Sequence, residues 1–394
     1  MADEPLDGAW RALCEQLAGA GEILADPRAP KDSATQAAGL RYLLHLVTSG
    51  LDLFVHNADP AHPEVSRPQD PDKRWGLDCT DANYGKAPIE GTGTYRVTGG
   101  PGNAHYLGIT VTAGALGTMG IQTIGALSRP GGLACEPDGS FELVLSPDEH
   151  PGNWIRTEPG VTGVSFRQFL YDWDTETPSW ITIERLDVSE PPSPDAASEL
   201  KKVGAFGGFV TGSASLWADY VDGLRQRAFN TFSPPNPPNS SYGATPDNVY
   251  GSGYFELAPD EAAIIEFTPP PCHYWNIQVG NYWFESLDYT YRQTSLNGHQ
   301  AVLDTDGVFR AVLTVADPGV ANWLDTAASP VLPATYRWQL PSVAFEDLPT
   351  PASRVVKVAD LESELHPATP RITPDERVAV LARRRLAVLR RYGR

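Results

Sequence analysis

Short motifs recur along the chain at a nearly constant separation, and this repetition constrains the fold more than any other feature. The Asp-Gly turn at position 138 returns at 306, an offset of 168 residues, and Pro-Gly at 151 returns at 318, an offset of 167. Matches at one spacing predict an internal duplication, that is, two related units. The remaining matches pair Asn153-Trp154 with Asn322-Trp323, and Asp81, Asn83 and Tyr84 with Asp247, Asn248 and Tyr250.

The repeated motif has a local physical basis. Asp-Gly suits a tight hairpin turn with positive φ, and the run that follows it, Phe141–Leu145 in the first half, is typical of a strand. Pro-Gly then breaks the strand, and Asn-Trp holds the next turn and buries a ring. We therefore expect Trp154 and Trp323 to be structural rather than functional.

Proline and glycine divide the chain into short elements. There are 36 of each, spread along the sequence, which is typical of many short strands joined by turns. Strand patterns dominate from 87 to 186 and again from 253 to 340. The prediction is a mainly β protein with flanking helices, built of two tandem, internally duplicated β-sandwich or jelly-roll-like units.

Four helices are expected from apolar spacing and capping residues: 7–23, 33–55, 215–229 and 374–392. The second has an apolar stripe made of Leu40, Leu43, Leu44, Val47 and Leu51. The last is cationic, and we expect it to dock onto the acidic body or a partner subunit. The predicted divisions are N-terminal helices (1–58), a first β unit (59–190), a helix with the second, site-bearing β unit (191–360), and a C-terminal helical tail (361–394).

The charge of the chain excludes some function classes. Its formal net charge is −19, which disfavours nucleic acids and anionic membrane surfaces as partners. No segment has the ~20 apolar residues of a membrane helix, and the acidic start does not resemble a signal peptide. The four cysteines are far apart in sequence. We expect buried free thiols in a cytoplasmic protein.

The duplication provides an internal control for locating a site. After the strand ending at Val279, the second half has a run of rings and ionisable groups that includes Glu285, Asp288, Arg292 and His299. The equivalent stretch of the first half, through Gly132, has one formally charged residue, Arg129. Folding alone does not require these groups. A mixed polar and aromatic cluster is typical of a small-molecule site.

We assign roles within that cluster. Glu285 is the favoured general acid or base, because neighbouring rings would partly desolvate it. His299 and Tyr289 are the expected helpers, and Asp288 with Arg292 would orient the site. The expected substrate-binding residues are Trp275, Asn281, Tyr282, Trp283, Arg292 and Asn297. Alternatively, Glu285 or Asp288 caps a turn or pairs with Arg292 at the surface.

These residues also resemble a known family. The run 281–289 is similar to the signature of the bacterial domain-of-unknown-function family 1214, often found with family 1254, although Phe284 stands where a second Trp is expected. Ser295-Leu296-Asn297, Asp317-Pro318-Gly319 and Asn322–Thr326 are similar too. The resemblance is strong over 251–340 and weaker over 75–185. It implies two layered β-sandwich or jelly-roll units and supplies no settled activity.

The sequence leaves three functions open. The favoured one is a cofactor-independent acid–base enzyme, a hydrolase, lyase or isomerase, acting on a small, largely apolar metabolite such as an aromatic, terpenoid, steroid or polyketide-like compound. The others are a non-catalytic protein that binds such a ligand, and a structural or assembly module with an aromatic subunit interface. No nucleophile elbow, P-loop or dinucleotide fingerprint is present. A metal site at His273 and His299 is not expected, and the chain is a possible homo-oligomer.

Overall fold

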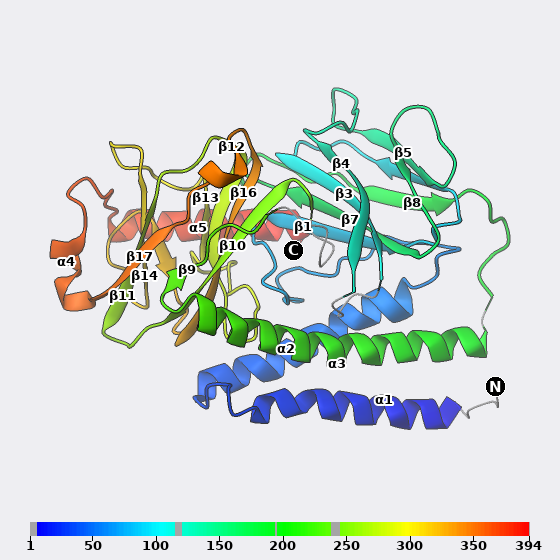
Figure 1. Ribbon diagram of the computed structural model, residues 1–394, viewed down its shortest axis with the longest axis horizontal. Helices are drawn as coiled ribbons and strands as arrows, with labels where there is room; N and C mark the ends of the chain where they lie inside the picture. Colours follow the sequence, from blue (N-terminus) through cyan, green and yellow to red (C-terminus); the bar gives the residue numbers. More distant parts are fainter. Residues whose placement is uncertain (1–5, 115–119, 194, 238–244, 394) are drawn as a thin grey trace.

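The structure is a computed structural model that describes residues 6–114, 120–193, 195–237 and 245–393. Two β units lie side by side, and three helices run along one side of the molecule (Figure 1). These helices are α1 (Leu6–Ala20), α2 (Ser33–Leu51) and α3 (Ala196–Arg227). They share one buried cluster. None of the described helices is long and apolar enough to cross a membrane.

The first unit contains eight strands in two sheets, with the orders β1-β7-β3-β4 and β6-β5-β2-β8. Its strands are β1 (Ala82–Pro88), β2 (Tyr95–Gly99), β3 (Tyr106–Ala113), β4 (Gln122–Arg129), β5 (Phe141–Ser146), β6 (Trp154–Arg156), β7 (Val161–Phe169) and β8 (Ile181–Arg185). The strand expected at Phe141–Leu145 is confirmed as β5, and the other strands of the unit lie largely within the expected range 87–186.

The second unit repeats this topology. After the short β9 (Thr231–Phe232), its sheets have the orders β10-β16-β12-β13 and β15-β14-β11-β17, which equal those of the first unit strand by strand. Its strands are β10 (Asn248–Glu256), β11 (Glu261–Phe267), β12 (Cys272–Val279), β13 (Ser295–Asn297), β14 (Phe309–Thr314), β15 (Trp323–Asp325), β16 (Val331–Pro341) and β17 (Ala352–Lys357). The mainly β fold of two related units is thus observed.

Within each unit, one hydrophobic cluster takes side chains from both sheets. In the second unit it includes Phe255 of β10 and Phe309 of β14, neither of which is exposed. Burial of large apolar side chains from both sheets therefore stabilises each unit. The finer assignment to a sandwich or jelly roll stays a prediction.

The repeated Asn-Trp motif makes the same contacts in both units. Asn153 Nδ2 donates to the carbonyls of Ala134 and Glu142, each at 2.8 Å. Asn322 Nδ2 donates to the carbonyls of Val302 and Arg310, at 2.6 and 2.9 Å. The indole N–H groups of both tryptophans donate to the carbonyl of a residue on the neighbouring strand. These contacts agree with a structural role for the motif.

The buried face of α2 differs from the predicted apolar stripe. Leu40 and Leu44 are more than half exposed, and another face of the helix is buried. That face is buried because its glycines leave space for aromatic rings and its polar groups form hydrogen bonds with buried partners. The buried residues are Thr35, Gly39, Tyr42, His45, Leu46, Ser49 and Gly50. Asp32 caps the helix by accepting a hydrogen bond from Thr35 N, and a π-helical turn, η2 (Asp52–His56), follows it.

Helix α3 is longer than expected, because it begins at Ala196 rather than at 215. Asp195 caps it by accepting a hydrogen bond from Ser198 N. Its glycine-rich first half hid the helical pattern. At Gly207 a Cβ atom would lie 1.9 Å from Gln16 Oε1 of α1, so the glycine permits close packing of the two helices.

The C-terminal helix α5 (Pro374–Tyr392) docks onto the body through arginines at seven-residue spacing. Arg377, Arg384 and Arg391 are each less than a tenth exposed. Arg377 pairs with Asp317 at 2.9 Å, and the guanidinium groups of Arg384 and Arg391 both lie over the ring of Trp173. Two short helical turns, η3 (Phe345–Asp347) and η4 (Val358–Asp360), and helix α4 (Leu361–Glu364) precede it.

Candidate active site

The connection between the third and fourth strands differs between the two units. In the first unit residues 114–121 join β3 to β4, whereas in the second unit residues 280–294 join β12 to β13. Part of the longer connection packs against the helices, since Tyr282, Trp283 and Phe284 belong to the buried cluster of α1, α2 and α3. The longer connection carries the ionisable residues that the sequence singled out.

Glu285 is buried and paired with a histidine of α2. Its Oε1 lies 2.6 Å from His45 Nδ1, and the two side chains are 2% and 9% exposed. Its Oε2 accepts a hydrogen bond of 2.8 Å from Asn281 Nδ2. A carboxylate away from water requires such partners. Glu285 and His45 therefore form a dyad that Asn281 holds in place.

A second buried carboxyl group, Asp78, lies beside the dyad. It accepts hydrogen bonds from Ser286 N at 3.1 Å and Ser286 Oγ at 2.9 Å. Burial raises the pKa of Asp78 to about 6, and the nearby charge of Glu285 acts in the same direction. Asp78 can thus gain or lose a proton close to neutral pH.

The backbone turns sharply before each of these carboxyl groups. Leu77 precedes Asp78 with φ of 46°, and Phe284 precedes Glu285 with φ of 59°. A hydrogen bond of 2.6 Å from Leu77 N to the carbonyl of Phe284 joins the two turns. Left-handed backbone at non-glycine residues is strained, and such strain clusters at functional sites.

Glu285 lines a cavity of about 270 Å³ between α2 and the 280–294 connection. Its walls combine apolar side chains with three arginines from separate elements, Arg41, Arg74 and Arg292. The other lining residues are Ala34, Thr35, Ala38, Asn281, Trp283, Leu287, Asp288, Ala327, Ala328 and Ser329. The size and the mixed polarity suit a small molecule.

The predicted aromatic residues take different places. Trp283 lines the cavity, donates from Nε1 to the carbonyl of Thr35 at 2.8 Å and stacks on Tyr42. Tyr282 lines a separate cavity of about 260 Å³. Trp275 lies in the core of the second unit, in edge contact with Phe267. Only Trp283 of these three contributes to the cavity of Glu285.

Asp288 and Arg292 line the cavity but do not pair as expected. Asp288 is exposed, and its Oδ1 accepts hydrogen bonds from the backbone N–H groups of Thr290 and Tyr291. This is the turn-capping alternative. Arg292 pairs instead with Asp325, at 2.9 Å.

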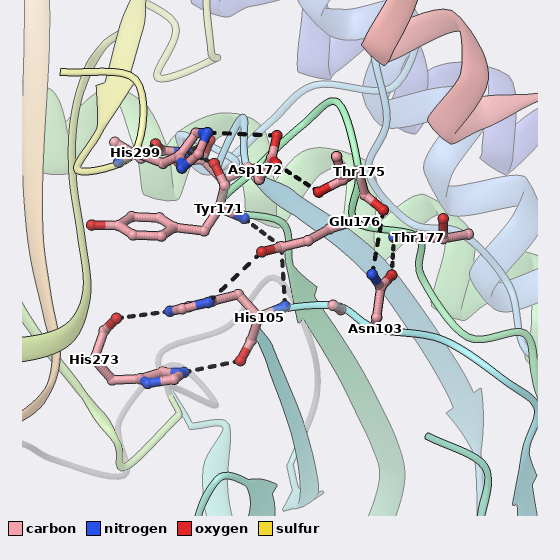
Figure 2. Close-up of polar contacts among 12 residues, drawn as sticks. Asn103, His105, Tyr171, Asp172, Thr175, Glu176, Thr177, His273 and His299 are labelled. Carbon is pink, nitrogen blue, oxygen red and sulfur yellow. Dashed lines mark hydrogen bonds and ion pairs between the residues drawn. The ribbon is translucent and has the colours of Figure 1, made fainter. Parts of the chain in front are cut away.

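His299, Tyr289 and Asn297 lie in other clusters. Tyr289 is buried against α5, with its hydroxyl 3.5 Å from that of Tyr392. Asn297 Nδ2 donates to Asp81 and to the carbonyl of Tyr171. His299 is half exposed, with its Nε2 3.6 Å from Asp172 (Figure 2). The expected grouping of His299 and Tyr289 with Glu285 is therefore not observed. His299 follows β13 and Tyr289 packs against α5, and both residues lie toward the contact between the units.

That contact contains two reciprocal pairs of repeat-equivalent residues. His105 Nε2 donates to the carbonyl of His273, and His273 Nε2 donates to that of His105, at 2.8 and 2.9 Å. Their rings stack at 4.1 Å (Figure 2), and burial lowers the pKa of His273. Likewise, Tyr106 donates to Asp247 and Tyr274 to Asp81. Since a carbonyl only accepts, both histidines carry the Nε2 proton and serve to join the units.

Among the residues that the structure describes, no group of three His, Cys, Asp or Glu side chains is placed to hold a metal ion.

Sequence reasoning missed two residues of the site, His45 and Asp78. His45 lies outside the predicted apolar stripe of α2, on the face that the helix actually buries, so the apolar pattern gave no signal for it. The sequence also held no signal for Asp78, because its burial depends on contact with Ser286, which is 208 residues away in the chain.

Comparisons with known proteins identify the family to which the chain belongs. A model of proteins of unknown function, DUF1214, matches residues 79–172, in the first unit rather than over 251–340, where the sequence motifs put the stronger resemblance. No curated protein matches. A solved Vibrio parahaemolyticus protein is 11% identical with a TM-score of 0.48, over 86% of this chain and 100% of that one, and this likeness supports no argument. A solved, uncharacterised protein from Burkholderia cenocepacia is 35% identical with a TM-score of 0.84, over 89% of this chain and 97% of that one. The chain therefore belongs to the family of proteins of unknown function DUF1214, and it is similar over most of its length to the Burkholderia protein.

Proposed function

We propose that this chain is a cofactor-independent acid–base enzyme, a hydrolase, lyase or isomerase that acts on a small molecule. The observation that carries the proposal is the buried Glu285–His45 dyad at the wall of a cavity of about 270 Å³. The strained turns before Glu285 and Asp78 support it. The connection between β3 and β4, which is the equivalent in the first unit, supports it as well, because its described residues, Gly114, Gly120 and Ile121, include no ionisable group.

In this proposal Glu285 is the group that meets the substrate. It takes a proton from a C–H group or from an attacking water molecule, and the hydrogen bond between its Oε1 and His45 Nδ1 holds the carboxyl group in place. Asn281 fixes the direction of the carboxylate through Oε2. Trp283 and Leu287 provide apolar surface for the body of the substrate.

The test uses deuterium uptake, so the product need not be known in advance. The full chain is incubated in D₂O with a panel of small metabolites, and mass spectrometry follows deuterium incorporation and substrate loss. For any compound turned over, Glu285→Gln should lower the rate at least about 100-fold, the usual contribution of a general acid or base.

Asp288→Asn is the matched control, because Asp288 lines the same cavity but is exposed and bonded to its own turn. We expect its rate to stay within about threefold of wild type, well below the loss typical of a general acid or base. A Glu285→Gln variant that retains wild-type turnover would exclude Glu285 from the chemistry.

One observation favours non-catalytic ligand binding as the second candidate. Both oxygens of Glu285 already have protein partners, and the side chain is 2% exposed. In that case a ligand would bind with no deuterium uptake or turnover. The structure disfavours the assembly alternative, since Tyr282, Trp283 and Phe284 are at most 5% exposed and buried within the chain.

A further inference from the structure

Three arginines line the cavity of Glu285: Arg41 of α2, Arg74 and Arg292. Arg292 pairs with Asp325 at 2.9 Å, whereas Arg41 and Arg74 form no ion pair with any residue that the structure describes. The chain as a whole has a formal net charge of −19, so two guanidinium groups without a carboxylate partner are contrary to its general composition. Such groups at a cavity attract an anion.

The arginine donors are largely uncommitted. Arg74 Nη1 donates to the carbonyl of Ser286 at 3.1 Å, while its Nε is buried and meets no hydrogen-bond partner among the described residues. Arg41 is exposed, and it forms no ion pair or hydrogen bond with the rest of the described chain. A guanidinium has five N–H donors, and a buried donor left unpaired is destabilising.

These groups define the chemistry of a ligand. A planar guanidinium fork matches an oxyanion with two oxygens. Because the carboxylates Glu285 and Asp288 line the same cavity, a monoanion meets less repulsion there than a dianionic phosphate, which favours a carboxylate. The apolar walls, Trp283 and Leu287 among them, favour an apolar body.

We propose that the substrate is a small monocarboxylate with an apolar body, whose carboxylate is bound by Arg41 and Arg74 while the body faces Glu285. This inference rests on the proposed function, since it takes the cavity as the substrate site. It replaces the expectation of a largely apolar substrate with an amphipathic one. Arg41 and Arg74 would be substrate-binding residues, and neither was predicted from the sequence.

Isothermal titration calorimetry of the full chain tests it with three probes of similar shape: phenylacetate, phenylacetamide and phenyl phosphate. We expect phenylacetate to bind most tightly and the neutral amide at least about tenfold more weakly, because hydrogen bonds to charged groups are lost. Arg41→Gln should raise the Kd of phenylacetate about tenfold for the same reason. Arg74→Lys, which keeps the charge but loses the fork, is a second variant and should also weaken binding.

Arg11→Gln is the matched control, because it removes the same charge from an exposed position of α1 and should leave the Kd unchanged. Equal binding of phenylacetate and phenylacetamide, equal effects of Arg41→Gln and Arg11→Gln, or no binding of phenylacetate at millimolar concentration would overturn the proposal. Tighter binding of phenyl phosphate would overturn the carboxylate assignment.

Glu285→Gln separates this inference from the proposed function. It removes a negative charge from the cavity, so phenylacetate should bind it at least as tightly as wild type. If the Glu285→Gln variant turns over substrate normally while Arg41→Gln weakens phenylacetate, the acid–base role fails and the carboxylate site stands. If Glu285→Gln abolishes turnover while Arg41→Gln leaves the Kd unchanged, the reverse holds.

Discussion

Replacing Gly39 by alanine tests how closely α2 approaches the wall of the cavity. A Cβ atom at Gly39 would lie 2.5 Å from Cζ2 of Trp283 and 2.5 Å from Cδ2 of Leu24. Carbon atoms prefer separations of about 3.5–4.0 Å, so the indole would have to retreat by about 1 Å. It is held in place by its bond to the carbonyl of Thr35 and by stacking on Tyr42.

Two opposing effects set the magnitude. Alanine in a helix interior stabilises by about 1 kcal/mol over glycine, whereas overpacking a buried site costs about 1–3 kcal/mol. Because the ring cannot move freely, we expect Gly39→Ala to lower the free energy of unfolding by about 1 kcal/mol. Gly204→Ala in α3 is the control, since no atom lies within 4 Å of its Cβ position, and it should stabilise by about 0.5–1 kcal/mol.

Urea denaturation followed by tryptophan fluorescence measures both variants. A Trp283→Leu background completes the design, because removing the indole should turn Gly39→Ala from destabilising to neutral or stabilising. Equal stabilisation by Gly39→Ala and Gly204→Ala in the wild-type background would refute the close contact between Gly39 and Trp283.

Three further predictions concern charge and hydrogen bonding. The pKa of Asp78 is raised from 3.8 to about 6 in the folded state, so the stability gained from its bound proton is present at low pH and is lost as the pH rises from about 4 to about 6. In urea titrations the free energy of unfolding of wild type should fall by up to about 3 kcal/mol over that window relative to Asp78→Asn. An equal dependence of stability on pH in the two proteins would contradict this. Arg377→Met should cost about 1–3 kcal/mol, because the buried carbonyl of Val320 and Oε1 of Gln293 lose their donor, whereas the exposed Arg383→Met should change the free energy of unfolding by less than about 0.5 kcal/mol. Similar values for the two variants would count against docking of α5 through Arg377. Asn322→Ala should lower the free energy of unfolding by at least about 1 kcal/mol more than Asn153→Ala in the same denaturation assay, because Asn322 is 1% exposed whereas water can reach Asn153. Equal losses of stability in the two variants would argue that burial does not set the energetic cost of removing the asparagine.

Much of the architecture followed from patterns within short stretches of sequence. The repeat of Asp-Gly and Asn-Trp about 168 residues apart predicted two related units, and the equal strand orders bear this out. Local turn chemistry and alternation are read within a few residues, so strands such as β5 were predictable. The extra polar groups after β12 were also visible, because the two halves could be compared directly.

The candidate site depended on contacts between distant segments. Glu285 was named from its neighbours in the chain, but its partner His45 lies 240 residues away on a helix whose buried face the apolar pattern misplaced. His299, which is close in sequence, lies in the contact between the units instead. Sequence spacing does not determine which side chains meet across two folded elements.

The sequence by itself determined the duplication, the strands and the connection that carries the ionisable groups, because each of these is encoded by nearby residues. Only the tertiary structure decided that Glu285 pairs with His45, that burial raises the pKa of Asp78, and that three arginines share one cavity. Burial, charge pairing and cavity shape arise from packing between segments, so no single stretch of the chain contains them.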